Sequence, residues 1–194
     1  MIESGLDFVR TARRVREHLG QRHRYAHVLR VARFATMLAR VHGHDARRAR
    51  TAGLLHDLAR LYSNERLLQE CAERGLSIDA FERTHPIVLH ARLGAEIARS
   101  EYGVTDEAIL SAIAKHTVGG AQMSTLDKII YLADALEPGR TFAERAAFAG
   151  VARRDLDAAM RDVLQSTIAY LRARGEPVAP QTLAALPSRE KRSA

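Results

Sequence analysis

The chain of 194 residues has one cysteine, no tryptophan and no long apolar run. A single thiol excludes a framework of disulfide bonds. Cys71 sits in a charged helical segment without a catalytic signature, so we expect a half-buried structural thiol. No stretch of about 18 apolar residues is present, which excludes a membrane-spanning helix. The first ten residues lack the hydrophobic region of a signal peptide, so we predict a cytoplasmic protein.

Aromatic residues and prolines are also scarce. Phenylalanine, tyrosine and tryptophan together make up 5% of the chain, and most of the five prolines fall near its end. Alanine, leucine and arginine dominate instead, and 46% of all residues are hydrophobic. This composition is typical of an all-α protein. The length suffices for one domain with a sizeable core.

Lysine is rare among the basic residues: of 30 basic residues, 27 are arginines. The net charge is +7 and the sequence pI is about 10.2. GC-rich codon usage is one explanation for the arginines. The other is an anionic partner, either nucleic acid or a phosphate-rich small molecule. The arginines are spread over many predicted helices and are not gathered in one arm, which argues against nucleic acid.

Apolar residues recur at three- and four-residue spacing through most of the chain, which predicts a single-domain helical bundle. Glycines, prolines and capping residues mark the helix ends. The predicted helices cover about residues 3–19, 22–42, 46–59, 64–74, 86–102, 106–116, 125–137, 141–149 and 153–174, with a short irregular piece at 79–84. We divide the chain into an N-terminal helix (1–19), a main domain (20–174) and a flexible, solvated C-terminal tail (175–194).

A histidine and an aspartate interrupt an apolar stretch at residues 53–59, whose sequence is GLLHDLA. Burying His56 and Asp57 without partners costs on the order of several kcal/mol. A metal ion is the economical explanation, because metals bind deprotonated nitrogen and oxygen donors on a rigid, dry wall. Further ligands must then come from other helices.

Four more polar residues lie in apolar helical surroundings: His27, His90, His116 and Asp134. Each alone has an ordinary explanation, such as a bond to a carbonyl, a buried ion pair or a place at a helix C-terminus. Six such side chains without any thiolate are hard to bury separately. Together they predict an imidazole–carboxylate site for iron, manganese, cobalt, nickel or zinc. Two ions about 3.5–4 Å apart, bridged by an aspartate and a water, suit six ligands better than one ion.

The order and spacing of His27, the His56-Asp57 pair and Asp134 resemble those of the HD-domain metallophosphohydrolases. Longer segments carry a closer resemblance: RYAH (24–27), GLLHDLAR (53–60), LHA (89–91), GA (94–95), AKHT (114–117) and MSTLDKIIYLADALEPGR (123–140). They look like the YqeK-like family, the HD-domain bis(5′-nucleosyl)-tetraphosphatases (symmetrical), which cleave diadenosine tetraphosphate into two ADP. The resemblance covers about residues 20 to 170. It implies an all-α bundle of the HD-domain type.

The resemblance also implies a metal centre. The residues that match iron ligands are His27, His56, Asp57 and Asp134. Two further positions, which hold a second metal or face the nucleotide, are His90 and His116. We expect one or two ions, with iron as the first choice and manganese, cobalt, nickel or zinc as alternatives.

Substrate contacts follow from the same resemblance. Positions near the phosphates are matched by Arg24, Thr117 and Arg140. Arg60 stands where a lysine is usual in the family. Arginine keeps the charge and adds bidentate phosphate geometry, so we expect it to be tolerated as a phosphate contact. His90 and His116 belong to this set where they face the nucleotide.

The implied reaction is metal-assisted hydrolysis of a phosphoanhydride bond. The ions hold a water, lower its pKa and direct it at a central phosphorus atom. Asp57 is expected to bridge the ions and to act in catalysis together with His90 and His116. The three arginines neutralise charge on the phosphoryl oxygens. Glu137 is expected to orient Arg140 or a metal ligand.

Two other functions stay open. One is a different HD-domain phosphohydrolase, acting on a mononucleotide, a cyclic dinucleotide or (p)ppGpp. The other is a basic nucleic-acid-binding protein with a structural metal, which only the charge of +7 supports. That protein would need an aromatic platform for single strands or a recognition helix, and neither stands out. The oligomeric state is open as well, with a homodimer among the options.

Overall fold

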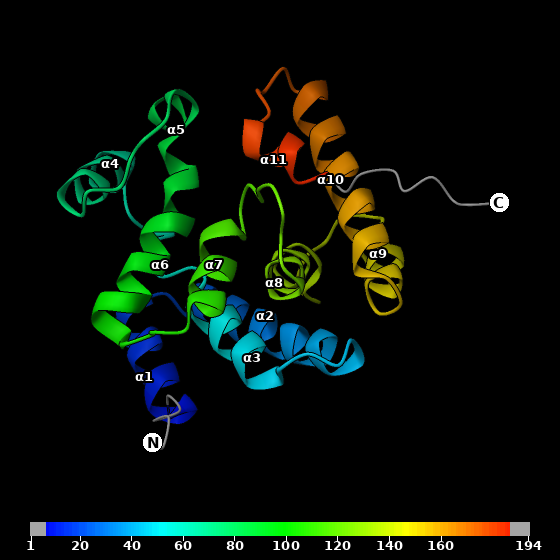
Figure 1. Cartoon of the computed structure of the whole chain (residues 1–194), viewed down its shortest axis with the longest axis horizontal. Coiled ribbons are helices and arrows are strands. Elements are labelled where there is room, and N and C mark those ends of the chain that lie inside the picture. Colours follow the sequence, from blue (N-terminus) through cyan, green and yellow to red (C-terminus); the bar gives the residue numbers. More distant parts are fainter. Residues whose placement is uncertain (1–6, 187–194) are drawn as a thin grey trace.

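The chain folds into a bundle of helices in the computed structural model, which describes residues 7–186 and contains no strand within that range. The helices are α1 (Phe8–Leu19), α2 (Arg22–Val41), α3 (Ala46–Leu55), α4 (Asn64–Glu73), α5 (Ala80–Thr84), the 3-10 helix η1 (Pro86–Val88), α6 (Leu89–Tyr102), α7 (Glu107–Lys115), α8 (Thr125–Leu136), α9 (Arg145–Ala152), α10 (Leu156–Ala173) and α11 (Pro180–Ala184). Figure 1 shows α2, α3, α7 and α8 together at the centre, with α9 and α10 beside α8. The predicted all-α fold is confirmed.

Helices α2 and α3 pack tightly because a glycine lies where they meet. A Cβ atom on Gly53 would lie 2.9 Å from the Cα atom of Ala32. Helix α8 packs on both α2 and α7, and its Ile129 and Ile130 are fully buried. The core therefore sits where these four helices meet, close to the residues predicted to form the site.

Capping residues start several helices where the sequence predicts them. The carboxylate of Asp45 accepts hydrogen bonds from the backbone amides of Arg47 and Arg48 at the start of α3. Ser124 and Asp127 form a reciprocal capping box at the start of α8. These bonds satisfy amides that the first turn of a helix leaves without partners.

Helix α3 is shorter than predicted. The apolar pattern predicts helix through residue 59, but α3 ends at Leu55 and a turn follows. In this turn the backbone amide of Arg60 donates to the carbonyl three residues earlier, on Asp57. The ring of His56 is held by the carbonyl of Gly53. The tighter turn lets the adjacent His56 and Asp57 both reach the buried interior.

Four other elements differ from their predicted bounds. Residues 79–84 were expected to be irregular, but they include α5, which a capping box between Asp79 and Glu82 begins. The helix expected at 141–149 is α9 (Arg145–Ala152), and the next helix begins at Leu156 because Asp155 caps it. Helix α1 begins at Phe8, and the earlier part of the predicted helix, residues 3–6, lies outside the described residues.

The C-terminal segment also differs from expectation. Within residues 175–186, expected to be a solvated tail, Pro180–Ala184 form α11. The Thr182 hydroxyl donates a hydrogen bond of 3.0 Å to the carbonyl of Val118, and Ala185 is buried. Contacts with the loop after α7 therefore order this part of the chain. Residues 187–194 lie outside the described range.

Cys71 is fully buried in α4, where a half-buried thiol was expected. Burial raises the pKa of this thiol to about 11. No helix within residues 7–186 is long and apolar enough to cross a membrane.

Candidate metal centre

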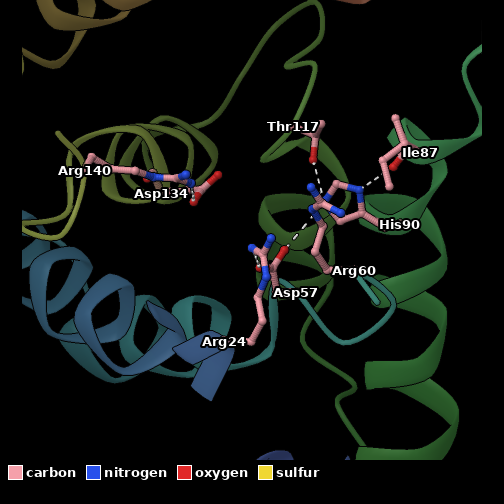
Figure 2. Close-up of a pocket in the computed structure, with 8 residues that line it drawn as sticks. All are labelled: Arg24, Asp57, Arg60, Ile87, His90, Thr117, Asp134 and Arg140. Atoms are coloured by element: carbon pink, nitrogen blue, oxygen red, sulfur yellow. Dashed lines mark hydrogen bonds and ion pairs between the residues drawn. The ribbon is translucent and has the colours of Figure 1, made fainter. Parts of the chain in front are cut away.

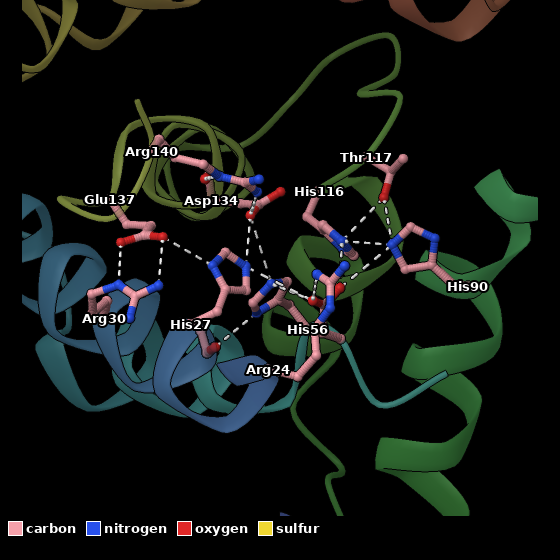
Figure 3. A network of polar contacts seen from close by, with 12 residues as sticks. Arg24, His27, Arg30, His56, His90, His116, Thr117, Asp134, Glu137 and Arg140 are labelled. Carbon is pink, nitrogen blue, oxygen red and sulfur yellow. Dashed lines mark hydrogen bonds and ion pairs between the residues drawn. The ribbon is translucent and has the colours of Figure 1, made fainter. Parts of the chain in front are cut away.

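Five helices bring the six predicted ligands to one place (Figure 2 for Asp57, Figure 3 for the other five). His27 lies in the second turn of α2, and His56 and Asp57 directly follow α3. His90 lies in the first turn of α6, His116 directly follows α7, and Asp134 is near the end of α8. All are buried except Asp134, whose side chain is 20% exposed. The predicted ligands therefore lie at or near the ends of helices, where the packing of the helices holds their side chains in place.

The first group of donor atoms surrounds one oxygen of Asp134. Its Oδ1 lies 3.0 Å from Nε2 of His27 and 3.9 Å from Nε2 of His56. One atom from each of these three residues lies within 4.8 Å of the others. Such a set can hold one metal ion.

The second group lies on the other side of Asp57. Nε2 of His90 and Nε2 of His116 lie 3.1 Å apart and face Oδ1 of Asp57 at 3.6 Å and 3.8 Å. His56, Asp57 and His116 form a second set of donors within 4.8 Å of one another. The Thr117 hydroxyl lies 3.1 Å from Nε2 of His90 and 3.0 Å from Nε2 of His116.

Asp57 stands between the two groups. Its Oδ2 lies 3.8 Å from Nε2 of His27 and 3.6 Å from Nε2 of His56, whereas its Oδ1 faces the other two histidines. One carboxylate oxygen therefore serves each group. This is the arrangement that a carboxylate bridging two metal ions requires.

The histidine rings are fixed so that their Nε2 atoms face inward. The Nδ1 atoms of His56, His90 and His116 each bond to a backbone carbonyl, at 2.8, 2.5 and 2.8 Å. Nδ1 of His27 bonds to the carboxylate of Glu137 at 3.1 Å. Since an acceptor at Nδ1 holds the proton there, the lone pair is left on Nε2, where a metal binds.

Buried atoms without partners support a cation at this place. Nε2 of His27 and Nε2 of His56 are buried and have no hydrogen-bond partner among the described residues. Uncompensated burial of polar atoms is costly, and native structures rarely leave it so. Two such atoms beside the carboxylates of Asp57 and Asp134 fit a transition-metal ion, and the absence of thiolate agrees with iron, manganese, cobalt, nickel or zinc.

Electrostatics keep the carboxylates charged and two of the histidines neutral. Burial would raise the pKa values of Asp57 and Asp134, but the surrounding histidines outweigh it, and both pKa values are lowered, that of Asp134 well below its usual range. Burial, together with the neighbouring histidine, lowers the pKa values of His90 and His116 to about 4. Charged carboxylates and neutral imidazoles are the protonation states that bind metals.

A cavity of ≈ 310 Å³ opens over this centre (Figure 2). Three arginines line it, namely Arg24, Arg60 and Arg140, together with Asp57, Ile87, His90, Thr117 and Asp134. Nη1 of Arg24 lies 3.5 Å from Oδ2 of Asp57. Arg140 donates from Nε to the carbonyl of Asp134 at 2.9 Å and from Nη2 to its carboxylate. The cavity is strongly cationic and can accept phosphate groups.

The structure thus brings together every site residue that the sequence predicts. It adds Arg30, which no pattern in the sequence singles out. Arg30 donates to both carboxylate oxygens of Glu137, at 2.6 and 3.1 Å. Burial opposes ionisation of Glu137, but hydrogen bonds from Arg30, the Gly139 amide and His27 together outweigh it and lower the pKa of that carboxyl to about 2. The Glu137 carboxylate bonds to Nδ1 of His27, whereas Arg140 meets Glu137 only through its backbone amide, which donates to the Glu137 carbonyl at 3.0 Å. Of the two predicted roles for Glu137, this geometry favours orienting the candidate ligand His27.

Comparisons with known proteins identify relatives of this chain. The HD domain family model matches residues 24–139. A Halalkalibacterium halodurans protein named bis(5′-nucleosyl)-tetraphosphatase, symmetrical, is 37% identical over 88% of this chain and 90% of its own. A Bacillus subtilis protein of the same name is 35% identical over 82% of this chain and 86% of its own. A crystal structure from Clostridium acetobutylicum, described as a predicted HD superfamily hydrolase involved in NAD metabolism, superimposes with a TM-score of 0.89 at 32% identity and covers 93% of this chain and 95% of its own.

Proposed function

This chain belongs to the HD-domain hydrolase family, and on that premise we propose that it cleaves diadenosine tetraphosphate symmetrically into two ADP. The Halalkalibacterium halodurans and Bacillus subtilis relatives are named for this activity. Their similarity to this chain extends over 90% and 86% of their own lengths. The observation that carries the proposal is the place of Asp57. Its two oxygens face two separate histidine groups beneath a cavity with three arginines.

The proposed metal ligands fall into two sets that share Asp57. His27, His56 and Asp134 complete one set, and His90 and His116 complete the other. We propose iron as the resident metal. When bound, the ions supply Lewis-acid chemistry, which activates a water and polarises phosphoryl oxygens.

The arginines are proposed to hold the polyphosphate over this centre. A tetraphosphate carries about four negative charges, and hydrolysis places more charge on the phosphoryl oxygens of the departing ADP. Arg24 and Arg140 are already held by Asp57 and Asp134, so their guanidinium groups need little reordering when substrate binds. Arg60 lines the same cavity and adds a third cation.

Water attacks one of the two central phosphorus atoms, and the bond to the oxygen of the other ADP half breaks. His90 and His116 are neutral at pH 7 because their pKa values are lowered to about 4. They therefore act as electron-pair donors rather than as acids. The Thr117 hydroxyl, within 3.1 Å of both rings, is proposed to donate to a substrate oxygen at the cavity wall.

Product analysis tests the proposal. The purified, metal-loaded enzyme is incubated with diadenosine tetraphosphate, and the nucleotides are separated and identified. We expect two ADP as the products. AMP with ATP, or no turnover, contradicts the proposal. Measuring bound metals in the same preparation tests the choice of iron.

A substrate panel separates this activity from the other HD-domain functions. Mononucleotides, cyclic dinucleotides and (p)ppGpp are compared with diadenosine tetraphosphate under the same conditions. The highest kcat/KM is expected for the dinucleoside tetraphosphate. We place the activity in the cytoplasm, and a homodimer stays a prediction.

A further inference from the structure

A second cavity adjoins the charged one, and its lining is aromatic. It has a volume of ≈ 730 Å³ and is lined by the end of α8, the loop that follows it, α9 and α10. Figure 1 shows α9 and α10 on the side of α8 away from α6 and α7. Arg140 lines both cavities. Asp134 lines the charged cavity, and the next residue, Ala135, lines the aromatic one. The two cavities therefore meet at Arg140.

Three of the ten phenylalanines and tyrosines of this chain line the second cavity. They are Phe142, Phe148 and Tyr170. The ring centroids of Phe142 and Phe148 are 6.2 Å apart, with the rings inclined at 51°. Phe142 is 40% exposed and Tyr170 is 61% exposed, and they are the two exposed aromatic side chains in the described part of the chain. Exposed rings gathered at one hollow mark a binding site.

The first cavity is strongly cationic and the second is not, and a nucleotide likewise has a charged phosphate part and an uncharged base. The first has three arginines, whereas the second has Arg140 at its junction, the carboxylate of Glu144 and the hydroxyls of Ser166 and Thr167. Phosphates require cations, and a purine requires flat apolar surfaces for its faces and polar groups for its edge. A nucleotide whose phosphates lie in the first cavity can extend past Arg140 and place its base in the second cavity.

We propose that the aromatic cavity binds one adenine base of the substrate, stacked against Phe142 and Tyr170. This inference rests on the proposed function, because it takes the phosphates to lie over the metal centre. It assigns base recognition to Phe142 and Tyr170. Arg140 then marks the boundary between the phosphate site and the base site.

The lack of tryptophan in this chain allows a direct test. The variant Phe142→Trp places a single tryptophan in the aromatic cavity. The metal-loaded variant is titrated with adenosine, which has a base and no phosphate, and with inorganic diphosphate, which has no base. We expect saturable quenching of the tryptophan emission by adenosine and no change with diphosphate. An emission that adenosine leaves unchanged overturns the proposal.

A matched variant controls for quenching in solution. Val41 is 54% exposed at the end of α2 and lines neither cavity. Adenosine should leave the emission of the Val41→Trp variant unchanged at concentrations that quench Phe142→Trp. Equal quenching of both variants overturns the proposal, because it shows collision in solution rather than binding.

Kinetics provide a second test with a conservative partner. Tyr170→Ala removes the ring, and Tyr170→Phe keeps it; the side chain is exposed, so neither change disturbs the core. We expect KM for diadenosine tetraphosphate to rise about 5- to 150-fold in the alanine variant, the range of a lost stacking contact, with kcat little changed. The phenylalanine variant should keep the wild-type KM. Inhibition by inorganic triphosphate, which has no base, should be equal in all three proteins.

Failure of this inference differs from failure of the proposed function. If the wild-type enzyme cleaves diadenosine tetraphosphate while Tyr170→Ala keeps its KM and adenosine does not quench, the base site is wrong and the function stands. If the wild-type enzyme does not cleave this substrate, the proposed function is wrong. Adenosine quenching still decides in that case whether the cavity binds a nucleoside.

Discussion

The carboxylate of Glu137 accepts a hydrogen bond of 3.1 Å from Nδ1 of His27. The two residues are 110 positions apart in the chain. Glu137 is itself held by both its bonds to Arg30 and by the backbone amide of Gly139. This arrangement fixes the ring of His27 with Nε2 toward the proposed metal and increases the electron density on that nitrogen.

Glu137→Gln should weaken metal binding and leave the fold intact. An amide keeps the size of the carboxylate but loses its charge, and it can present its NH₂ group to His27. We expect metal affinity to fall by about 10- to 100-fold, measured by competition with a chromogenic chelator. Circular dichroism should be unchanged. An affinity equal to that of the wild type would show that Glu137 does not position His27.

Asp57→Ala should abolish hydrolysis and lower the metal content. Asp57 is the residue whose two oxygens face both histidine groups, so its loss removes a ligand from each. Metal analysis of the purified variant, together with an assay of ADP release, measures the effect. Asp79→Ala is a suitable control, because Asp79 caps α5 and lines neither the metal centre nor the charged cavity. Retained turnover in Asp57→Ala would refute the bridging role.

Arg140→Ala should act mainly on substrate binding. A lost charge-assisted hydrogen bond is worth about 1.5–3 kcal/mol, so KM should rise by roughly 10- to 150-fold while kcat falls less. The exposed Arg13, paired with Glu17 on α1, provides the control variant Arg13→Ala. Steady-state kinetics with diadenosine tetraphosphate measure both values. Unchanged kinetics in Arg140→Ala would exclude the phosphate contact.

Local sequence signals predicted most of the helices. The predicted helix ends were wrong where contacts with residues distant in the chain determine the end. Leu58 and Ala59 continue the apolar pattern of the predicted helix, so the sequence cannot show that α3 stops at Leu55 and that a turn carries His56. Helix α11 depends on the bond from Thr182 to the carbonyl of Val118, 64 positions earlier. Residues 175–186 contain two prolines and no capping residue before Pro180, and the sequence gives no sign of such a distant partner.

The candidate metal ligands were easier to predict than the residues that hold them in place. Histidines and aspartates in apolar helices are conspicuous because each needs a partner. Arg30 gave no such signal, since it is one of 27 arginines and its partner Glu137 lies 107 positions later. The aromatic cavity was missed for the same reason. Phe142, Phe148 and Tyr170 become neighbours only when α9 and α10 pack against α8.

Gly53→Ala should destabilise the fold. The added Cβ atom would lie 2.9 Å from the Cα of Ala32, and backbone atoms cannot move aside without separating α2 from α3. Overpacking of this kind costs about 1–3 kcal/mol. Gly150→Ala in α9 is the matched control, since its Cβ would meet only the Arg154 side chain at 3.9 Å. That variant should gain about 0.4–1 kcal/mol. Urea denaturation of both measures the difference, and equal stability would contradict the close packing.

Cys71 should make the stability of the protein sensitive to alkaline pH. Burial raises the thiol pKa from 9.0 to about 11 in the folded state. Since the folded pKa is the higher one, the unfolded state loses its proton first as pH rises. The stability that the protonated, buried thiol contributes to the folded state is therefore fully present below pH 9 and is lost as the pH rises toward 11. Tyr102, with a pKa raised by burial to about 12, adds to the same trend, so Cys71→Ala is needed to isolate the thiol. The difference in unfolding free energy between wild type and Cys71→Ala should shrink between pH 8 and pH 11. A constant difference across that range would show that Cys71 has the same pKa in both states.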